Sequence, residues 1–185
     1  MRGAKSPMRK KIAVPVLLAA ACAFGLALVP ACEKIDGDAA PARGNADFFA
    51  SFPVRLGEKT LSLRLALTDL ERRRGLTGCR GLDGSAGMLF VYADADRRAF
   101  WMRGVPADLS VGFFDASGTL LETREMFAED VETTVSRDAD VKFVLEMRAG
   151  WFEENSVSAG TRLDLAALAA AIRSRGFSPT KFALE

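Results

Sequence analysis

The sequence predicts a mainly β domain, a β-rich α+β fold in which one compact antiparallel sheet, barrel-like or sandwich-like, carries two or three short helices. Apolar residues alternate with polar ones in several short runs, and glycine-containing turns separate those runs. Helix signals extend over only a few residues at a time. At 185 residues the chain is long enough for one such domain with its own core.

The first 31 residues have the pattern of a secretory signal. Residues 2–11 carry five positive charges and no acid, and an apolar, alanine-rich run over residues 12–31 follows. Cys32 comes directly after a Val-Pro-Ala segment that resembles a bacterial lipobox, so we expect a lipid on Cys32. Two alternatives stay open: an uncleaved N-terminal helix, and an ordinary signal-peptidase cut at the same bond.

The charge balance and the absence of histidine exclude several classes of function. Without residues 1–31 the chain has 20 Lys and Arg against 24 Asp and Glu, a net charge of −4, so we predict no nucleic-acid partner. A chain without histidine has no Ser-His-Asp or Cys-His centre and no His-ligated metal. We therefore predict no metal and no cofactor, and these exclusions weigh against an enzyme.

The domain begins after a polar linker. Residues 32–47 are rich in Gly, Ala, Asp and Pro, which is typical of a flexible tether. The packed domain is expected over residues 48–176. Its first elements are a pair of strands at Val54–Leu56 and Leu61–Leu67, joined by a turn that contains Gly57.

A short helix and a glycine-rich loop follow the first strands. Thr68 and Glu71 have the spacing of a capping box, the arginines at 72–74 suit the last turn of a helix, and Gly75 ends it. Glycine then recurs at every third position up to Gly87, which predicts a loop with several residues at positive φ.

Three strands and a hairpin loop occupy the middle of the chain. We expect strands at Met88–Tyr92, at Leu109–Asp115, which should be half-buried, and at Thr119–Glu125, from their alternating or compact apolar runs. Residues 93–98 are predicted to form a polar turn. The segment 115–118, Asp-Ala-Ser-Gly, has the composition of a hairpin loop.

The C-terminal part combines one more strand with two helical segments. An acidic, irregular stretch over residues 126–140 precedes a strand at Val141–Met147. A helical turn is expected at Trp151–Glu154, and Asp164 can cap a final amphipathic helix. Residues 177–185 are predicted to be a C-terminal tail.

Four motifs of this domain recur, in the same order, in one known family. They are Gly87-Met-Leu-Phe90, Phe100-Trp-Met-Arg103, Asp108-Leu-Ser-Val-Gly-Phe-Phe-Asp115 and Leu145-Glu-Met-Arg-Ala-Gly-Trp-Phe152. They resemble the DUF192 (UPF0127) family of small bacterial and archaeal proteins over about residues 53–165. The resemblance implies a compact β-rich domain, in members that are often exported or lipid-anchored, without an established biochemical activity.

Aromatic and charged side chains within these motifs suggest a binding groove. The candidate residues are Arg98, Trp101, Met102, Arg103, Asp108, Glu146 and Trp151. Arginine pairs with carboxylate or phosphate groups and stacks on tryptophan, so the groove suits a small anionic or sugar ligand, or a protein of the cell envelope. In the alternative interpretation both tryptophans are core residues and no groove exists.

The combined hypothesis is a membrane-tethered, envelope-facing binding or accessory module. It is exported, faces the periplasm and is anchored through Cys32; the alternative location is soluble, in the periplasm or secreted. The alternative function is a carboxylate-dependent hydrolase acting on cell-envelope material, which requires acids such as Asp108, Asp115 and Glu146 to converge in one cleft. No residue is assigned a catalytic role.

Overall fold

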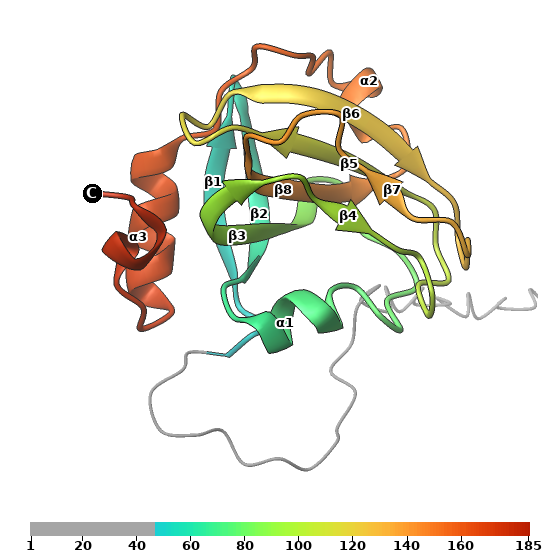
Figure 1. Cartoon of the computed structure of the whole chain (residues 1–185), viewed down its shortest axis with the longest axis horizontal. Coiled ribbons are helices and arrows are strands. Elements are labelled where there is room, and N and C mark those ends of the chain that lie inside the picture. The colour runs from blue at the N-terminus through green and yellow to red at the C-terminus, as the bar shows by residue number, and fades with distance from the viewer. Residues whose placement is uncertain (1–46) are drawn as a thin grey trace, which may run out of the picture.

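The computed structural model describes residues 47–185, and Figure 1 shows their arrangement. The predicted signal segment 1–31, Cys32 and all but the last residue of the tether at 32–47 lie outside the described residues. Within residues 47–185, no helix is long and apolar enough to cross a membrane.

A six-stranded sheet forms the framework of the domain. Its strands, in chain order, are β1 (Ser51–Leu56), β2 (Lys59–Ala66), β3 (Ala86–Asp96), β5 (Leu109–Phe114), β6 (Leu120–Met126) and β8 (Val141–Arg148). Their order in the sheet is β1-β2-β3-β8-β5-β6, and every neighbouring pair is antiparallel except β2 and β3. A separate antiparallel pair joins β4 (Ala99–Phe100) to β7 (Thr134–Val135). The predicted mainly β fold is confirmed, although the described strands do not close into a barrel.

Four short helical segments complete the fold. They are α1 (Asp69–Arg74), α2 (Trp151–Glu154), α3 (Leu165–Ser174) and the 3-10 helix η1 (Pro179–Phe182). The predicted capping box of α1 is present: the backbone N–H of Glu71 donates to Thr68 Oγ1 at 3.2 Å, and that of Thr68 donates to Glu71 Oε2 at 3.0 Å. At α3, the Asp164 carboxylate accepts from the N–H of Ala167 at 2.9 Å, as predicted.

The parallel pairing of β2 with β3 determines where α1 lies. Two parallel neighbours cannot be joined by a tight turn, so the connection over residues 67–85 must cross the sheet. It carries α1 and the glycine loop over one face, which we call the α1 face. The core of this face includes Phe90, Val111, Phe113 and Val144. Cys79 of the loop is buried there and disulfide-bonded, so it is no free thiol.

The opposite face of the sheet, the α3 face, is covered by α2, α3 and η1. Its core includes Leu89, Phe143 and Leu145 from the central strands. Phe182 and Leu184 are also buried in this core. Residues 177–185, expected to be a C-terminal tail, therefore fold back through η1, which packs its aromatic side chain against the sheet.

Two predictions about local structure are also corrected. Strand β3 continues to Asp96 through the segment expected to be a polar turn, because pairing with β8 resumes after a bulge, at Asp96 and Val141. The irregular stretch 126–140 contains the short strand β7. The hairpin loop is confirmed: Asp115 Oδ1 accepts from the N–H of Thr119 at 2.8 Å, and Gly118 has φ +77°.

Candidate functional site

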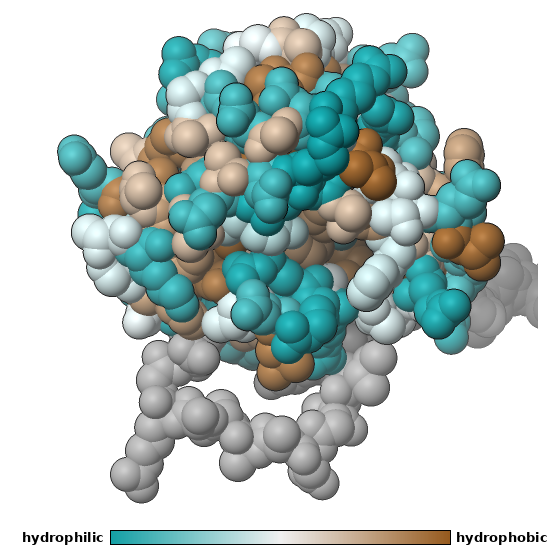
Figure 2. Space-filling model, viewed as in Figure 1, coloured by the Kyte–Doolittle hydropathy of each residue, from teal (hydrophilic) through white to brown (hydrophobic). Residues whose placement is uncertain are grey.

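A pocket of about 240 Å³ opens on the α1 face, between α1, β3, β8 and the segment around β4. Figure 2 shows a hollow on this side of the molecule, above α1, with apolar surface visible between polar side chains. Four aromatic residues and three arginines are among those that line the pocket: Phe90, Tyr92, Phe100, Trp101, Arg72, Arg73 and Arg74.

Glu146 forms the floor of the pocket. It lies on β8 between Met88 of β3 and Val111 of β5, and it is only 5% exposed. Among residues 47–185 its carboxyl group has no hydrogen-bond partner and no ion pair. Burial raises the pKa of Glu146 to about 8. At neutral pH the pocket floor is therefore an uncharged acid, which offers one O–H donor and a carbonyl acceptor.

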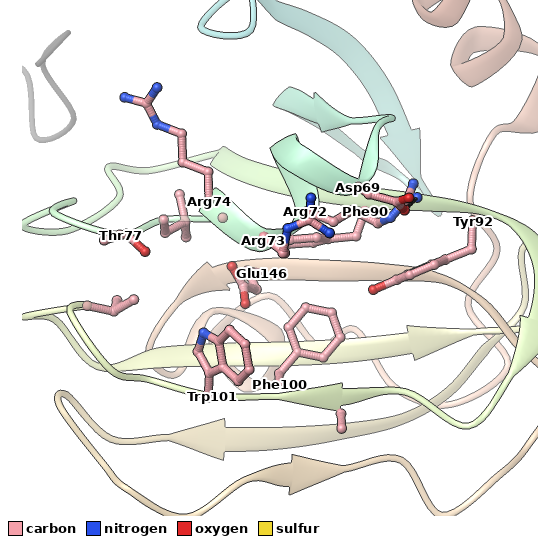
Figure 3. Close-up of a pocket in the computed structure, with 14 residues that line it drawn as sticks. Asp69, Arg72, Arg73, Arg74, Thr77, Phe90, Tyr92, Phe100, Trp101 and Glu146 are labelled. Atoms are coloured by element: carbon pink, nitrogen blue, oxygen red, sulfur yellow. Dashed lines mark hydrogen bonds and ion pairs between the residues drawn. The ribbon is translucent and has the colours of Figure 1, made fainter. Parts of the chain in front are cut away.

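The other buried polar residues of the described chain all have partners. The Ser110 hydroxyl donates to Glu125 at 2.6 Å, and the Ser136 hydroxyl donates to a backbone carbonyl at 2.8 Å. Lys142 and Arg175 also donate to backbone carbonyls. A buried polar group without a partner is costly, so native proteins leave few of them. Glu146 differs from these four residues: its carboxyl group has no partner in this part of the chain, and its oxygens are not fully enclosed but face the pocket (Figure 3).

Tyr92 adds a second polar group to the interior of the pocket. Its ring lies between two guanidinium groups, with Arg98 Cζ 3.8 Å and Arg72 Cζ 4.9 Å from the ring centroid. Burial raises the pKa of Tyr92, so its hydroxyl keeps the proton. In Figure 3 this hydroxyl points into the pocket that Glu146 lines.

The arginines at 72–74 lie along the mouth of the pocket on the last turn of α1. Arg72 has a structural role, because its Nη1 donates to the carbonyl of Leu67 at 3.0 Å and to that of Val91 at 2.8 Å. It also forms an ion pair with Asp69. These bonds fix α1 over the edge of β3 and so hold one wall of the pocket in place.

Three of the residues predicted for the site lie at or beside the pocket. Glu146 forms its floor, and Trp101, 60% exposed, lines its mouth. Arg98 stacks on Tyr92 and its Nε donates to the carbonyl of Val141 at 3.2 Å, so it supports the pocket from outside.

The other four predicted residues lie elsewhere. Met102 is buried in the core of the α1 face, and Arg103 is exposed away from the pocket. Asp108 accepts a backbone hydrogen bond from the loop after β6. Trp151 is 3% exposed and belongs to the core of the α3 face. A groove containing both tryptophans is therefore not formed.

The carboxylates considered for hydrolysis do not converge. Asp108 and Asp115 flank the two ends of β5, roughly 20 Å apart along an extended strand, and neither lines the pocket. Asp69 lines it together with Glu146, but Asp69 is engaged by Arg72. Among the described residues, no group of three or more Cys, Asp or Glu side chains is placed to hold a metal ion.

Reasoning from the sequence missed Tyr92 and Arg73, which also line the pocket. The sequence predicts a strand at Tyr92 and the C-terminal turn of a helix at Arg73, and the structure has both elements there. The crossover between β2 and β3 brings these two residues to the same pocket. The parallel pairing behind that crossover has no local signal in the sequence.

Comparison with known proteins gives a family and a shared fold. The family model DUF192, described as "Uncharacterized ACR, COG1430", matches residues 53–165, and no curated protein matches the chain. A crystal structure of a "putative transcription regulator" from Sinorhizobium meliloti 1021 is similar, at 26% identity and TM-score 0.60, over 67% of this chain and 97% of that one. A protein of unknown function from Novosphingobium aromaticivorans DSM 12444 has the same fold, at 21% identity and TM-score 0.58, over 62% and 84% of the two chains. Because the family model spans more than half of its residues, the chain belongs to the DUF192 family.

Proposed function

We propose that this domain is a binding module that holds a small polar ligand in the pocket between α1 and β8. One observation carries the proposal: Glu146 is buried, has no partner within the described chain and faces the pocket. A ligand that hydrogen-bonds to this carboxyl group would supply the interaction that the protein leaves out.

The pocket also has the composition expected of a binding site. Its walls are largely aromatic, and its few polar groups, Glu146 and Tyr92 among them, point inward. Its volume of about 240 Å³ is below the usual range for drug-sized ligands, so the ligand must be small.

Binding is favoured over the hydrolase alternative. A neutral buried acid can act as a general acid, but glycoside hydrolysis also needs a second, free carboxylate. The other carboxylate that lines the pocket, Asp69, is paired with Arg72 at its mouth.

A ligand screen of the purified full chain tests the proposal. D-glucose, D-glucuronate, D-glucosamine and benzoate are each added, and the melting temperature and tryptophan emission are recorded. At least one probe should raise the melting temperature by several degrees at 100 times its Kd. It should also change the emission of Trp101, which lines the mouth, and a Trp101→Phe variant should lose that change.

Matched substitutions make the screen specific to the pocket. Glu146→Leu should weaken binding at least tenfold, whereas Glu153→Gln, an exposed glutamate on the far face, should leave it unchanged. Equal affinity of wild type and Glu146→Leu for every probe that binds would refute the proposal, as would the absence of any binding.

We further propose that the chain is exported and that Cys32 becomes the first residue of the mature protein. The signal pattern of residues 1–31 supports export. A lipidated Cys32 would carry a thioether-linked lipid, so the state of its sulfur atom separates the anchored form from the soluble one.

The mass of the mature protein decides between the two forms. A lipidated Cys32 would add a diacylglyceryl mass and place the protein in the membrane fraction. A soluble form would lack that mass, and a Cys32→Ser variant would be exported equally well. Detection of the uncleaved N-terminus in the cytoplasmic fraction would contradict export.

A further inference from the structure

The mouth of the pocket has an excess of positive charge. Of the arginines at 72–74, Arg72 is neutralised by Asp69. Arg74 is directed to the aromatic rings before β1, with its Cζ 5.0 Å from the centroid of Phe49. Arg73 is exposed, lines the pocket and has no hydrogen bond or ion pair within the described residues. It is therefore available to a ligand, and it favours an anionic group.

The floor of the pocket does not oppose an anion. Because burial keeps Glu146 protonated at neutral pH, no negative charge lies beneath the ligand. Glu146 and the Tyr92 hydroxyl can each donate and accept a hydrogen bond. Paired hydroxyl groups on the ligand match this arrangement, since each of them also donates and accepts.

The walls of the pocket suit a ring with an apolar face. Trp101 exposes its indole at the mouth, and Phe100 lies beside it in the same wall (Figure 3). The C–H face of a pyranose ring can lie on such an aromatic surface while its hydroxyl groups point away from it. The volume of about 240 Å³ restricts the ligand to one such ring.

We infer that the ligand is an anionic monosaccharide, a sugar acid whose carboxylate pairs with Arg73, whose ring lies on Trp101 and whose hydroxyl groups bond to Glu146 and Tyr92. This inference rests on the proposed function and names the ligand class of the same pocket. Arg73 disfavours a cationic ligand at the mouth of the pocket. A neutral sugar would leave Arg73 unused.

Calorimetric titration of the full chain at pH 6.5 tests the ligand class. D-glucuronate should bind at least tenfold more tightly than D-glucose, because the two share a ring and differ in the carboxylate. D-glucosamine should bind most weakly. Arg73→Gln should reduce the preference for glucuronate over glucose to within twofold, whereas Arg173→Gln, an exposed arginine on α3, should keep it.

The pH dependence gives a second, independent test. The ionisable groups that line the pocket with Glu146 are Asp69, Arg72, Arg73, Arg74 and Tyr92. Above pH 8 Glu146 loses its proton and repels the ligand carboxylate, so the affinity for glucuronate should fall about tenfold between pH 7 and pH 9. Glu146→Gln, which keeps a neutral hydrogen-bonding group, should bind glucuronate without this loss.

Each outcome separates the ligand class from the proposed function. Tighter binding of glucosamine or glucose than of glucuronate would overturn the sugar-acid inference and leave a binding module. Binding of benzoate but not of glucuronate would contradict the inference that the ligand contains a sugar ring. Failure of all four probes would overturn both proposals, and glucuronate binding that Arg73→Gln and Glu146→Leu leave unchanged would place the site elsewhere.

Discussion

The two faces of the sheet differ in whether the protein supplies a partner for a buried ionisable side chain. On the side of α3, Arg175 is fully buried, yet its Nη1 donates to the carbonyl of Leu65 at 2.7 Å and its Nη2 pairs with Glu71. On the α1 face, Glu146 is 5% exposed and has no partner in the described chain. The protein thus supplies partners for Arg175, whereas the described residues supply none for Glu146.

Under the proposed function, the difference separates a structural group from a ligand-binding one. Arg175 links the end of α3 to β2 and to the N-terminus of α1, since Glu71 is also the capping residue of that helix. Removing Arg175 should destabilise the fold where α3, β2 and α1 meet. Glu146 contributes no such link and destabilises the folded domain as its carboxylate forms. Under the proposed function this cost is tolerated because the ligand needs the unpartnered group.

The largest expected effect is a pH dependence of the free energy of unfolding that arises from Glu146. The pKa of Glu146 in the folded state, about 8, lies above its ordinary value of 4.5, so the folded state holds a proton that the unfolded state releases between these values. The free energy of unfolding should therefore fall as pH rises from 4.5 to 8, by on the order of 5 kcal/mol from this group. Urea unfolding at pH 5, 7 and 9 measures it. Glu146→Gln should lack this decline, and equal declines in both proteins would contradict the account.

Removing Arg175, which has its partners within the protein, should have a comparable cost at neutral pH. Arg175→Met leaves the largely buried carboxylate of Glu71 without its cation, so we expect a loss of about 3–5 kcal/mol in the free energy of unfolding. Chemical denaturation checks this value. Arg173→Met, at an exposed position of the same helix, should change it by less than about 0.5 kcal/mol.

The two tryptophans extend the comparison to apolar residues. Trp151→Ala removes a side chain that is 3% exposed on the α3 face, and it should cost about 3–5 kcal/mol of stability. Trp101→Ala, at a position 60% exposed, should cost less than about 1 kcal/mol but abolish ligand binding. Denaturation and titration of both variants separate the two roles. A large stability loss in Trp101→Ala would show that it is a core residue.

The smallest expected effect concerns α1, which serves both faces. Thr68→Ala removes one half of the capping box, so a loss of about 1 kcal/mol is expected. Thr133→Ala, in an exposed loop, provides the control. If α1 positions Arg73, the Thr68 variant should also bind its ligand more weakly, and unchanged affinity would indicate that the wall of the pocket does not depend on the cap.

Much of the fold could be predicted because its signals are local. The capping box at Thr68, the aspartate cap at Asp164 and the hairpin at 115–118 each depend on a few neighbouring residues. The burial of Phe182 could not be predicted in this way. The core that receives η1 comes from distant strands, so the segment carries no periodic pattern of its own.

The candidate site was only partly predictable for the same reason. Trp101 and Glu146 are candidates because each lies in a motif that combines aromatic and charged side chains, and both line the pocket. Trp151 gave the same local signal but lies on the other face. The face on which a motif lies depends on strand order and register, and the position of Arg73 depends on a crossover.

The most direct test of the central claim is the titration of the Glu146 carboxyl carbon by ¹³C NMR in the full chain, with Glu146→Gln used to assign the signal. The account predicts a midpoint near pH 8, because the carboxyl group is buried at the floor of the pocket without a partner. A midpoint near 4.5 would mean that the group is hydrated or paired. In that case Glu146 would resemble Arg175, and the pocket would lose the feature that assigns it a ligand.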